Sequence, residues 1–273
     1  MIKVREVQVN SYVTASKLPD ADYVINPYIG CPHKCIYCYA EFMKRFTGHM
    51  HEEWGDFVDI KICNNRVALD RLEGSSILFG SVTDAYNQYE KKYKITRKIL
   101  SEFVGFHAKI DILTKSDLVV RDIDLLKKIP DIRVGFSINS LDEEFLRKTE
   151  PFASSALRRI RAMQTLRDSG IRTYLFMSPI FPGITKFVDL IEAVDMCSDS
   201  FYFENLNLRG AYMPRVFKFI ANNYPEHIGL YEKIYNKKDK SYWADLSDDI
   251  NEYCVRNELD YKLYFYHEQI KKI

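Results

Sequence analysis

The sequence has few glycines and prolines, no long hydrophobic run and no recognisable export signal. It holds 11 Gly and 9 Pro in 273 residues, too few for a collagen-like or low-complexity chain. No stretch approaches the ~18 consecutive apolar residues of a membrane-spanning helix, so no membrane partner is expected. Residues 1–7 alternate between apolar and charged side chains and lack the apolar centre of a signal peptide. These absences favour a soluble globular protein, and we expect it to be cytoplasmic.

The sequence also lacks an excess of charge of either sign. Lys and Arg number 39 against 38 Asp and Glu, so the formal net charge is +1. A nucleic-acid binder that relies on its overall charge is therefore excluded, whereas a local basic patch remains open. Three basic clusters occur, at residues 91–94, 158–161 and 237–240. Each is either a solvated helix face or a track for phosphates.

Six cysteines in a chain without an export signal point to a reducing compartment. There, clustered cysteines more often bind metal or act in catalysis than form disulfides. A chain of 273 residues also buries a core without a disulfide or metal to hold it together. No repeat and no Pro-, Gly- or Ser-rich linker interrupts it, so residues 1–273 are predicted to form a single domain.

What the sequence does have is a regular alternation of short apolar runs and amphipathic patterns. The runs that predict strands are 24–26, 59–63, 76–82, 109–113, 133–138, 171–180 and 201–208, with a further alternating run at 261–270. The patterns that predict helices are 37–45, 67–73, 94–106, 123–128, a helix from 143, 155–169 and 187–194. Alternation of this kind predicts an α/β fold with a parallel sheet. Five or six units are too few for an eight-stranded barrel, which leaves a partial β/α barrel or an open doubly wound sheet.

Both architectures bind ligands at the carboxyl ends of their strands. The residues at these ends are polar or rich in Gly and Pro. They are Cys31, Thr83, Asp84, Thr114 to Ser116, Ser137 to Asn139, Pro179 to Thr185 and Glu204 to Asn207. This agreement predicts one ligand site at that edge of the sheet.

The first of these loops contains three cysteines, Cys31, Cys35 and Cys38, in the pattern C-x3-C-x2-C. Four interpretations are open. The cysteines could be buried on one helix face, form a disulfide, or bind zinc with His33 as a fourth ligand. Alternatively, three thiolates hold a [4Fe–4S] cluster and leave one iron free for chemistry.

The motif around the cysteines resembles that of the radical S-adenosylmethionine (radical SAM) enzymes, in which an aromatic residue precedes the third cysteine, as Tyr37 does here. The longer run 26–40 (NPYIGCPHKCIYCYA) is similar to the branch that contains spore photoproduct lyase and its DNA-repair-photolyase-like relatives. The segments 82–90 (VTDAYNQYE), 113–116 (LTKS) and 136–139 (FSIN) continue this resemblance in order. A radical SAM mobile-pair type protein is a further candidate.

This resemblance implies a partial (β/α)6 barrel over residues of about 20–210, with a helical and strand extension over about 211–273. It implies one [4Fe–4S] cluster and one SAM. One-electron reduction, by a partner such as flavodoxin or ferredoxin, cleaves SAM to methionine and a 5′-deoxyadenosyl radical, which abstracts hydrogen from a substrate. The cofactor carries this chemistry, and the protein supplies position and electrostatics.

Residue roles follow from the resemblance. Cys31, Cys35 and Cys38 are implied to be the cluster ligands, and Tyr37 is implied to pack toward the adenine of SAM. A bend at residues 179–185 fits the adenine or ribose, and an ordinary Pro-Gly turn fits it equally well.

The remaining implied SAM contacts are Thr83 and Asp84 at the methionyl amine and Lys115 and Ser137 at the methionyl carboxylate. An ammonium group needs an acceptor and a carboxylate suits a lysine, which agrees with these residue types. The plain alternatives are a helix N-cap at 83–84 and a solvated loop lysine at 115.

Candidates for a substrate pocket are Glu204, Asn207, Arg209 and His267. For Glu204 a surface charge is an equal alternative, and for His267 a structural role in the strand predicted at 261–270 is favoured.

The branch favours a nucleic-acid base or lesion as substrate, and with it a lyase in DNA repair. In spore photoproduct lyase a cysteine just before the amine-binding motif returns a hydrogen atom to the product radical. Here Ser81 or Val82 stands in that neighbourhood, and an O–H bond is too strong to replace S–H. Cys63 and Cys197 are more typical of small buried hydrophobic residues. The alternatives are a peptide or partner-protein substrate and, from another class, a non-enzymatic zinc- or iron–sulfur-binding module.

Overall fold

The structure is a computed structural model that describes residues 2–266. Its main sheet has the strand order β11-β10-β9-β8-β7-β6-β3-β2. The bounds are β2 (Val13–Ala15), β3 (Tyr23–Ile25), β6 (Ser76–Phe79), β7 (Lys109–Thr114), β8 (Asp131–Ser137), β9 (Arg172–Ile180), β10 (Ser200–Asn205) and β11 (Tyr261–Leu263). All neighbours pair in parallel except β2, which is antiparallel to β3.

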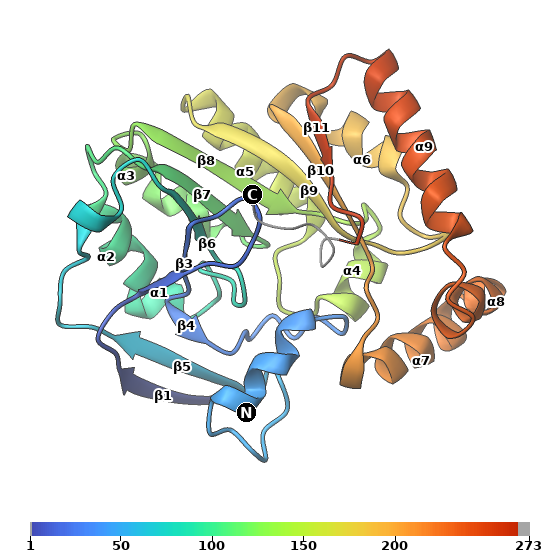
Figure 1. The fold of residues 1–273 in the computed structure, drawn as a ribbon, viewed down its shortest axis with the longest axis horizontal. Coiled ribbons are helices and arrows are strands. Elements are labelled where there is room, and N and C mark those ends of the chain that lie inside the picture. The colour runs from blue at the N-terminus through green and yellow to red at the C-terminus, as the bar shows by residue number, and fades with distance from the viewer. Residues whose placement is uncertain (1, 267–273) are drawn as a thin grey trace.

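Helical segments connect the parallel strands and flank the sheet (Figure 1). They are α1 (Glu90–Tyr93), α2 (Ile95–Glu102), α3 (Ile123–Leu126), α4 (Glu143–Thr149), α5 (Ala156–Asp168), α6 (Phe187–Val194), α7 (Met213–Asn223), α8 (Ile228–Tyr231) and α9 (Ser241–Arg256). The strands β3 and β6 to β10 form the core of a partial β/α barrel, which confirms the predicted fold class. No helix of the described residues is long and apolar enough to cross a membrane.

The sequence prediction was wrong for two elements. The run at 59–63 does not join the barrel: β5 (Phe57–Ile62) lies in a separate sheet with β1 (Lys3–Gln8) and β4 (Tyr28–Ile29), in the order β1-β5-β4. Its apolar pattern identifies a buried strand but carries no information about which partner it pairs with. The helix expected at 67–73 is only the 3-10 turn η2 (Leu69–Arg71).

The C-terminal strand is shorter than predicted. β11 covers Tyr261–Leu263 and pairs in parallel with β10, so it extends the barrel sheet at its edge. The helix expected at 155–169 is confirmed by α5, which begins after the N-cap Ser155 and ends at Asp168. His267 lies outside the described residues.

Gly135, which has no side chain, allows the middle of the sheet to pack closely. Gly135 on β8 is opposite Tyr174 on β9, and a Cβ at Gly135 would lie 2.0 Å from the Tyr174 ring. The ring occupies that space, and its hydroxyl donates to Asp111 Oδ1 on β7 at 2.7 Å. Arg133 Nε donates to the same carboxylate at 2.8 Å. One tyrosine therefore links three adjacent strands.

We predict that Gly135→Ala lowers the free energy of unfolding by about 1–3 kcal/mol, because a new methyl group in a filled core forces the ring and backbone apart. The matched control is Gly229→Ala on the exposed surface of α8, where a Cβ meets no atom within 4 Å. This change should stabilise the protein by about 0.4–1 kcal/mol. Urea denaturation of the metal-free chain measures both, and equal effects of the two substitutions would contradict the packing argument.

Candidate functional site

The three motif cysteines lie on an irregular loop between β4 and the 3-10 segment η1 (Tyr39–Phe46). The loop begins at Gly30, whose φ is +82° and whose Cβ would lie 2.5 Å from the carbonyl oxygen of Phe57. Only glycine fits this turn. Cys31, Cys35 and Cys38 form no disulfide and do not share a helix face, so the structure supports neither of those interpretations.

The cysteine thiols are held in a mainly apolar environment. Burial raises the pKa of Cys31 to about 12 and also raises the pKa values of Cys35 and Cys38. The indole N–H of Trp54 donates to Cys38 Sγ at 3.2 Å. Thiolates in such a place need a positive partner, and three sulfur donors are the ligand set that iron–sulfur clusters take. The donor chemistry therefore fits a cluster.

A single-ion site receives no such support. Within residues 2–266, no group of three or more His, Cys, Asp or Glu side chains is arranged to hold one metal ion. His33, the suggested fourth zinc ligand, has its Nδ1 3.5 Å from Asp84 Oδ2. A [4Fe–4S] cluster differs because each cysteine binds a separate iron, so its ligands need not converge on one point.

A buried carboxylate joins the cysteine loop to the barrel. Glu150 is fully buried, accepts hydrogen bonds from the Tyr37 hydroxyl and from Arg159 Nη2, and lies 3.9 Å from Lys115 Nζ. Burial acts to raise the pKa of Glu150, but the charges of Arg159 and Lys115 outweigh it and hold the pKa below its usual value. Lys115 Nζ also donates to Ser137 Oγ at 2.5 Å. Arg159 and Lys115 thus both act on this one carboxylate, Arg159 through a hydrogen bond and Lys115 from a greater distance.

Arg159 is the functional residue that sequence reasoning missed most clearly. It belongs to the basic cluster 158–161, yet it is fully buried and donates to the carbonyl oxygens of Ser137 and Ser154, both at 2.7 Å. A signal existed, because Arg159 falls on the apolar side of α5 together with Ala156, Ala162, Met163 and Leu166. A cation within an apolar stripe is rare unless it has a buried partner. Nothing in the sequence singled out Glu150 as that partner.

Thr83 and Asp84 connect three loops at the same edge of the sheet. The Thr83 hydroxyl donates to the Gly30 carbonyl at 2.7 Å. Asp84 Oδ1 accepts from the Thr114 hydroxyl and the Tyr86 N–H at 2.7 and 2.8 Å, and Oδ2 accepts from the Lys115 N–H at 2.7 Å. Asp84 therefore organises a turn, although not as the N-cap of an α-helix, since α1 begins only at Glu90.

The site continues across the next two strands. Ser137 Oγ donates to the Ser178 carbonyl at 2.8 Å, and the Ser178 hydroxyl donates to Glu204 at the end of β10. The following loop is more exposed: Arg209 Nε donates to Asn207 Oδ1 at 2.8 Å. The structure thus brings Glu204 together with Ser137, while Asn207 and Arg209 lie farther along the chain in the adjoining loop.

Asn139, which follows β8, is fully buried, and neither Nδ2 nor Oδ1 of its side chain has a hydrogen-bond partner among the described residues. Its carbonyl oxygen accepts from the Thr185 hydroxyl at 2.9 Å, so Asn139 borders the 179–185 bend. Buried amides are nearly always hydrogen-bonded. An unpaired one at the strand ends is consistent with a polar ligand in this site.

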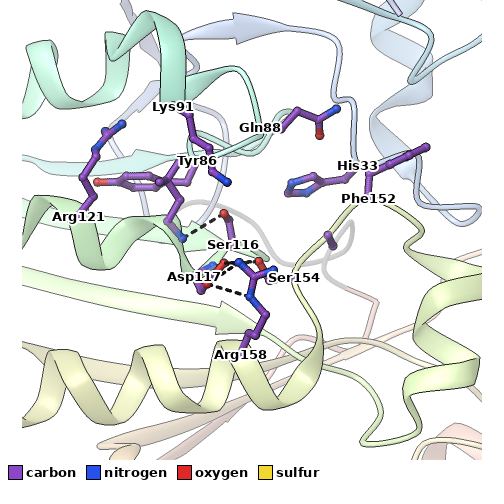
Figure 2. Close-up of a pocket in the computed structure, with 12 residues that line it drawn as sticks. His33, Tyr86, Gln88, Lys91, Ser116, Asp117, Arg121, Phe152, Ser154 and Arg158 are labelled. Atoms are coloured by element: carbon purple, nitrogen blue, oxygen red, sulfur yellow. Dashed lines mark hydrogen bonds and ion pairs between the residues drawn. The ribbon is translucent and has the colours of Figure 1, made fainter. Parts of the chain in front are cut away.

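A cavity of about 360 Å³ lies next to the cysteine loop, which contributes His33 to its lining (Figure 2). It is lined by His33 of that loop, Lys91 of α1, Arg121, and Arg158 of α5, whose guanidinium pairs with Asp117 at 2.7 Å. Two of the three basic clusters, 91–94 and 158–161, therefore meet at one opening beside the cysteines.

Comparison with other proteins agrees with this geometry. The family model described as the radical SAM superfamily matches residues 25–196, more than half of the chain. An uncharacterized protein of Methanocaldococcus jannaschii is 39% identical over 237 residues, which cover 86% of this chain and 88% of that one. A protein of Pseudomonas phage M6 named radical SAM Nalpha-GlyT isomerase is 27% identical over 172 residues, 60% of this chain and 34% of that one.

Among solved structures, a variant of spore photoproduct lyase with bound AdoMet and dinucleoside spore photoproduct has a TM-score of 0.54 at 18% identity, covering 78% of this chain and 63% of that chain. Streptococcus suis SuiB bound to S-adenosylmethionine has a TM-score of 0.53 at 17% identity, covering 89% and 49%. At these identities the likeness concerns the fold. The cysteine loop, the parallel partial barrel and the family match lead to one conclusion: the chain belongs to the radical SAM superfamily, whose enzymes use a [4Fe–4S] cluster and SAM.

Proposed function

We propose that this radical SAM enzyme binds its cluster through Cys31, Cys35 and Cys38 and acts on a nucleic-acid base. When bound and reduced, the cluster and SAM supply a 5′-deoxyadenosyl radical that removes a hydrogen atom from the substrate. The chain contributes three sulfur ligands, all of them free thiols. The Trp54 N–H, already directed at Cys38 Sγ, adds a hydrogen bond that tunes the cluster.

The observation that carries the proposal is the position of Lys115 between Glu150 and Ser137. Arg159 is committed to Glu150 and to backbone carbonyls, whereas Lys115 lies 3.9 Å from that carboxylate and remains partly accessible. Together with the hydroxyl of Ser137, Lys115 is suited to bind the methionyl carboxylate of SAM. The Tyr37 hydroxyl also donates to Glu150. Glu150 therefore positions the cysteine loop relative to the site proposed for the methionyl carboxylate.

Other parts of SAM find matching groups nearby. Asp84 accepts three hydrogen bonds from the chain, has His33 Nδ1 3.5 Å from Oδ2, and offers a carboxylate to the methionyl amine, with Thr83 beside it. The Tyr37 ring packs edge-on against Phe181 of the 179–185 bend, with centroids 5.5 Å apart, and borders the space for the adenine. The unpaired amide of Asn139 would gain its missing hydrogen bonds from bound SAM.

A nucleobase substrate agrees with the spore photoproduct lyase structure of similar fold, which binds a dinucleoside photoproduct. Glu204 near the end of β10, with Asn207 and Arg209 in the loop after it, offers both donors and acceptors to a base edge. We do not extend the proposal to spore photoproduct itself. Ser81 stands in the neighbourhood of the hydrogen-donating cysteine of that enzyme. Its side chain is a hydroxyl and not a thiol, and it accepts a hydrogen bond from Asn26 Nδ2 at 2.9 Å.

The remaining thiols are poorly placed to supply that hydrogen atom. Cys63 follows β5 of the small sheet and is buried. The carbonyl oxygen of Cys197 accepts a hydrogen bond from the Thr173 hydroxyl, near the start of β9. Cys197 therefore lies toward the amino ends of the strands. The site is at the carboxyl ends, so a repair lyase that needs a thiol would have to obtain it elsewhere.

We further propose that flavodoxin or ferredoxin, acting as the reductant, docks at the cavity beside His33. Lys91 and Lys92 of α1 are exposed at or next to this opening, and Arg121 and Arg158 line it. Weak redox encounters rely on complementary charge and a small contact area. The barrel core and the extension are proposed to act as one domain in a reducing cytoplasm, because β11 of the extension pairs with β10 of the core.

The cluster prediction concerns iron. After anaerobic reconstitution, the protein should contain iron and sulfide and cleave SAM when reduced with dithionite. Replacing Cys31, Cys35 or Cys38 by alanine should abolish both, whereas Cys254→Ala in α9, a buried cysteine remote in sequence from the loop, should keep both. Elemental analysis and quantification of 5′-deoxyadenosine test this. One zinc with no sulfide, or intact cluster without SAM cleavage, would reject the assignment.

The SAM prediction concerns Lys115. A hydrogen bond between charged groups contributes about 1.5–3 kcal/mol, so Lys115→Met should raise the Kd for SAM by about 10- to 150-fold. Ser137→Ala should raise it by about 2- to 10-fold, since it removes the neutral hydroxyl that holds Lys115 Nζ in place. The control is Lys148→Met in α4, whose partner Glu144 is on the surface. Equilibrium dialysis with cluster-loaded protein measures the Kd, and identical values for the two lysine variants would refute the role of Lys115.

The reductant prediction separates electron supply from chemistry. Lys91→Glu combined with Lys92→Glu should slow SAM cleavage driven by reduced flavodoxin or ferredoxin by about 10-fold or more at low salt, and the difference should shrink as ionic strength rises. The rate with dithionite should not change. Lys237→Glu combined with Lys238→Glu, in an exposed cluster of the C-terminal extension, is the control. Equal slowing with dithionite would show that the substitutions act on the site instead.

A further inference from the structure

An exposed ridge of aromatic side chains follows directly after the third cysteine. In η1, Tyr39 is 50% exposed, Phe42 48% and Phe46 66%. Single exposed apolar residues are ordinary, but a contiguous group on one short segment marks an interaction surface. The established chemistry of the site does not require these rings, since they lie outside the sets of residues that surround Glu150 and Asp84.

The ridge is held outward by the way η1 packs. In a 3-10 helix, side chains three residues apart lie above one another. Tyr39, Phe42 and Arg45 therefore align, with Phe46 beside them, and all four are exposed. The opposite side is anchored, because Ala40 packs with Trp54 and Phe57 in a separate small cluster beneath the segment.

The ridge carries a cation that pairs with rings instead of carboxylates. The guanidinium of Arg45 lies 4.7 Å from the centroid of Phe46 and 5.7 Å from that of Phe42. Among the described residues it forms no ion pair, whereas Glu41 of the same segment is held by Arg215 Nη2 at 2.7 Å. Exposed rings interleaved with an arginine are the composition that single-stranded nucleic acid binds, by stacking of bases and by cation–π contact.

The ridge begins beside the proposed SAM site. The Tyr39 hydroxyl donates to the carbonyl of Ser81, the residue before the 82–84 segment that borders the site. One end of the ridge therefore adjoins this segment, and Phe46 stands at the other end of η1.

We propose that Tyr39, Phe42, Arg45 and Phe46 form a stacking platform that binds unpaired nucleobases flanking the base on which the enzyme acts. This inference rests on the proposed nucleobase substrate and specifies its form: a single strand or a locally opened one, since a duplex hides the faces of its bases. The platform itself carries one cation, Arg45, so it contacts few phosphates and stacking provides most of the affinity. The dependence of binding on salt is accordingly shallow.

Binding of a fluorescently labelled single-stranded DNA oligonucleotide to cluster-loaded enzyme with SAM, followed by anisotropy, tests the platform. Phe42→Ala and Phe46→Ala should each weaken binding by about 5- to 150-fold, and Phe42→Trp should restore it. Leu157→Ala, at another side chain that is about half exposed (52%), is the control and should have no effect. The matching duplex should bind more weakly than the single strand, and the slope of log affinity against log salt should correspond to about one or two phosphates.

The outcomes distinguish this inference from the proposed function. SAM cleavage with dithionite should be unchanged in both phenylalanine variants. If the wild-type protein itself did not cleave SAM, that result would count against the enzyme assignment and not against the platform. Unchanged oligonucleotide affinity in the variants, no binding by the wild type, or equal binding of duplex and single strand would each overturn the platform. Slower cleavage with flavodoxin and unaltered oligonucleotide binding would assign the ridge to the reductant instead.

Discussion

The buried ion pair of Glu150 and Arg159 is the interaction on which the arrangement of the site depends. Removing two charges from water costs several kcal/mol for each ion, and the attraction between them offsets this only if their remaining hydrogen-bonding groups also find partners. The partners here come from separate elements: Tyr37 from the cysteine loop, and the carbonyl oxygens of Ser137 and Ser154 from the end of β8 and the start of α5. The need to satisfy one charged pair therefore sets the position of three loops relative to one another.

The same pair explains why Lys115 is available to a ligand. Arg159 has its guanidinium directed to Glu150 and to two backbone carbonyls, so its hydrogen bonds are all committed to the chain. Lys115 lies farther from Glu150, at 3.9 Å, and is held near Ser137 by a hydrogen bond. Under the proposed function, Lys115 meets the methionyl carboxylate of SAM, and the hydrogen bond from Tyr37 to Glu150 fixes the cysteine loop relative to it. Electrostatic preorganisation of this kind requires no rearrangement when the ligand arrives.

Sequence reasoning located residues whose positions follow from strand order and missed those whose positions follow from packing. Asp84, Lys115 and Ser137 were found because parallel strands end at one edge and polar residues there stand out against apolar runs. Glu150 was missed because it follows a helix, and a carboxylate in such a place is ordinary. The strand at 59–63 was recognised but assigned to the wrong sheet, since periodicity reports burial and not pairing. Arg159 alone left a readable signal, in the apolar stripe of α5.

The near-zero net charge is consistent with a protein that serves partners of negative charge through separate local surfaces. Bulk positive charge would attract an acidic electron carrier and a nucleic acid to the same places and would make them compete. Here the basic opening beside His33 has lysines and arginines and few exposed rings, whereas η1 has rings and one arginine. Under the two proposals, charge selects the electron carrier at one surface and stacking selects the nucleic acid at the other. A net charge near zero then favours selectivity, because the rest of the molecule adds little nonspecific attraction for either partner.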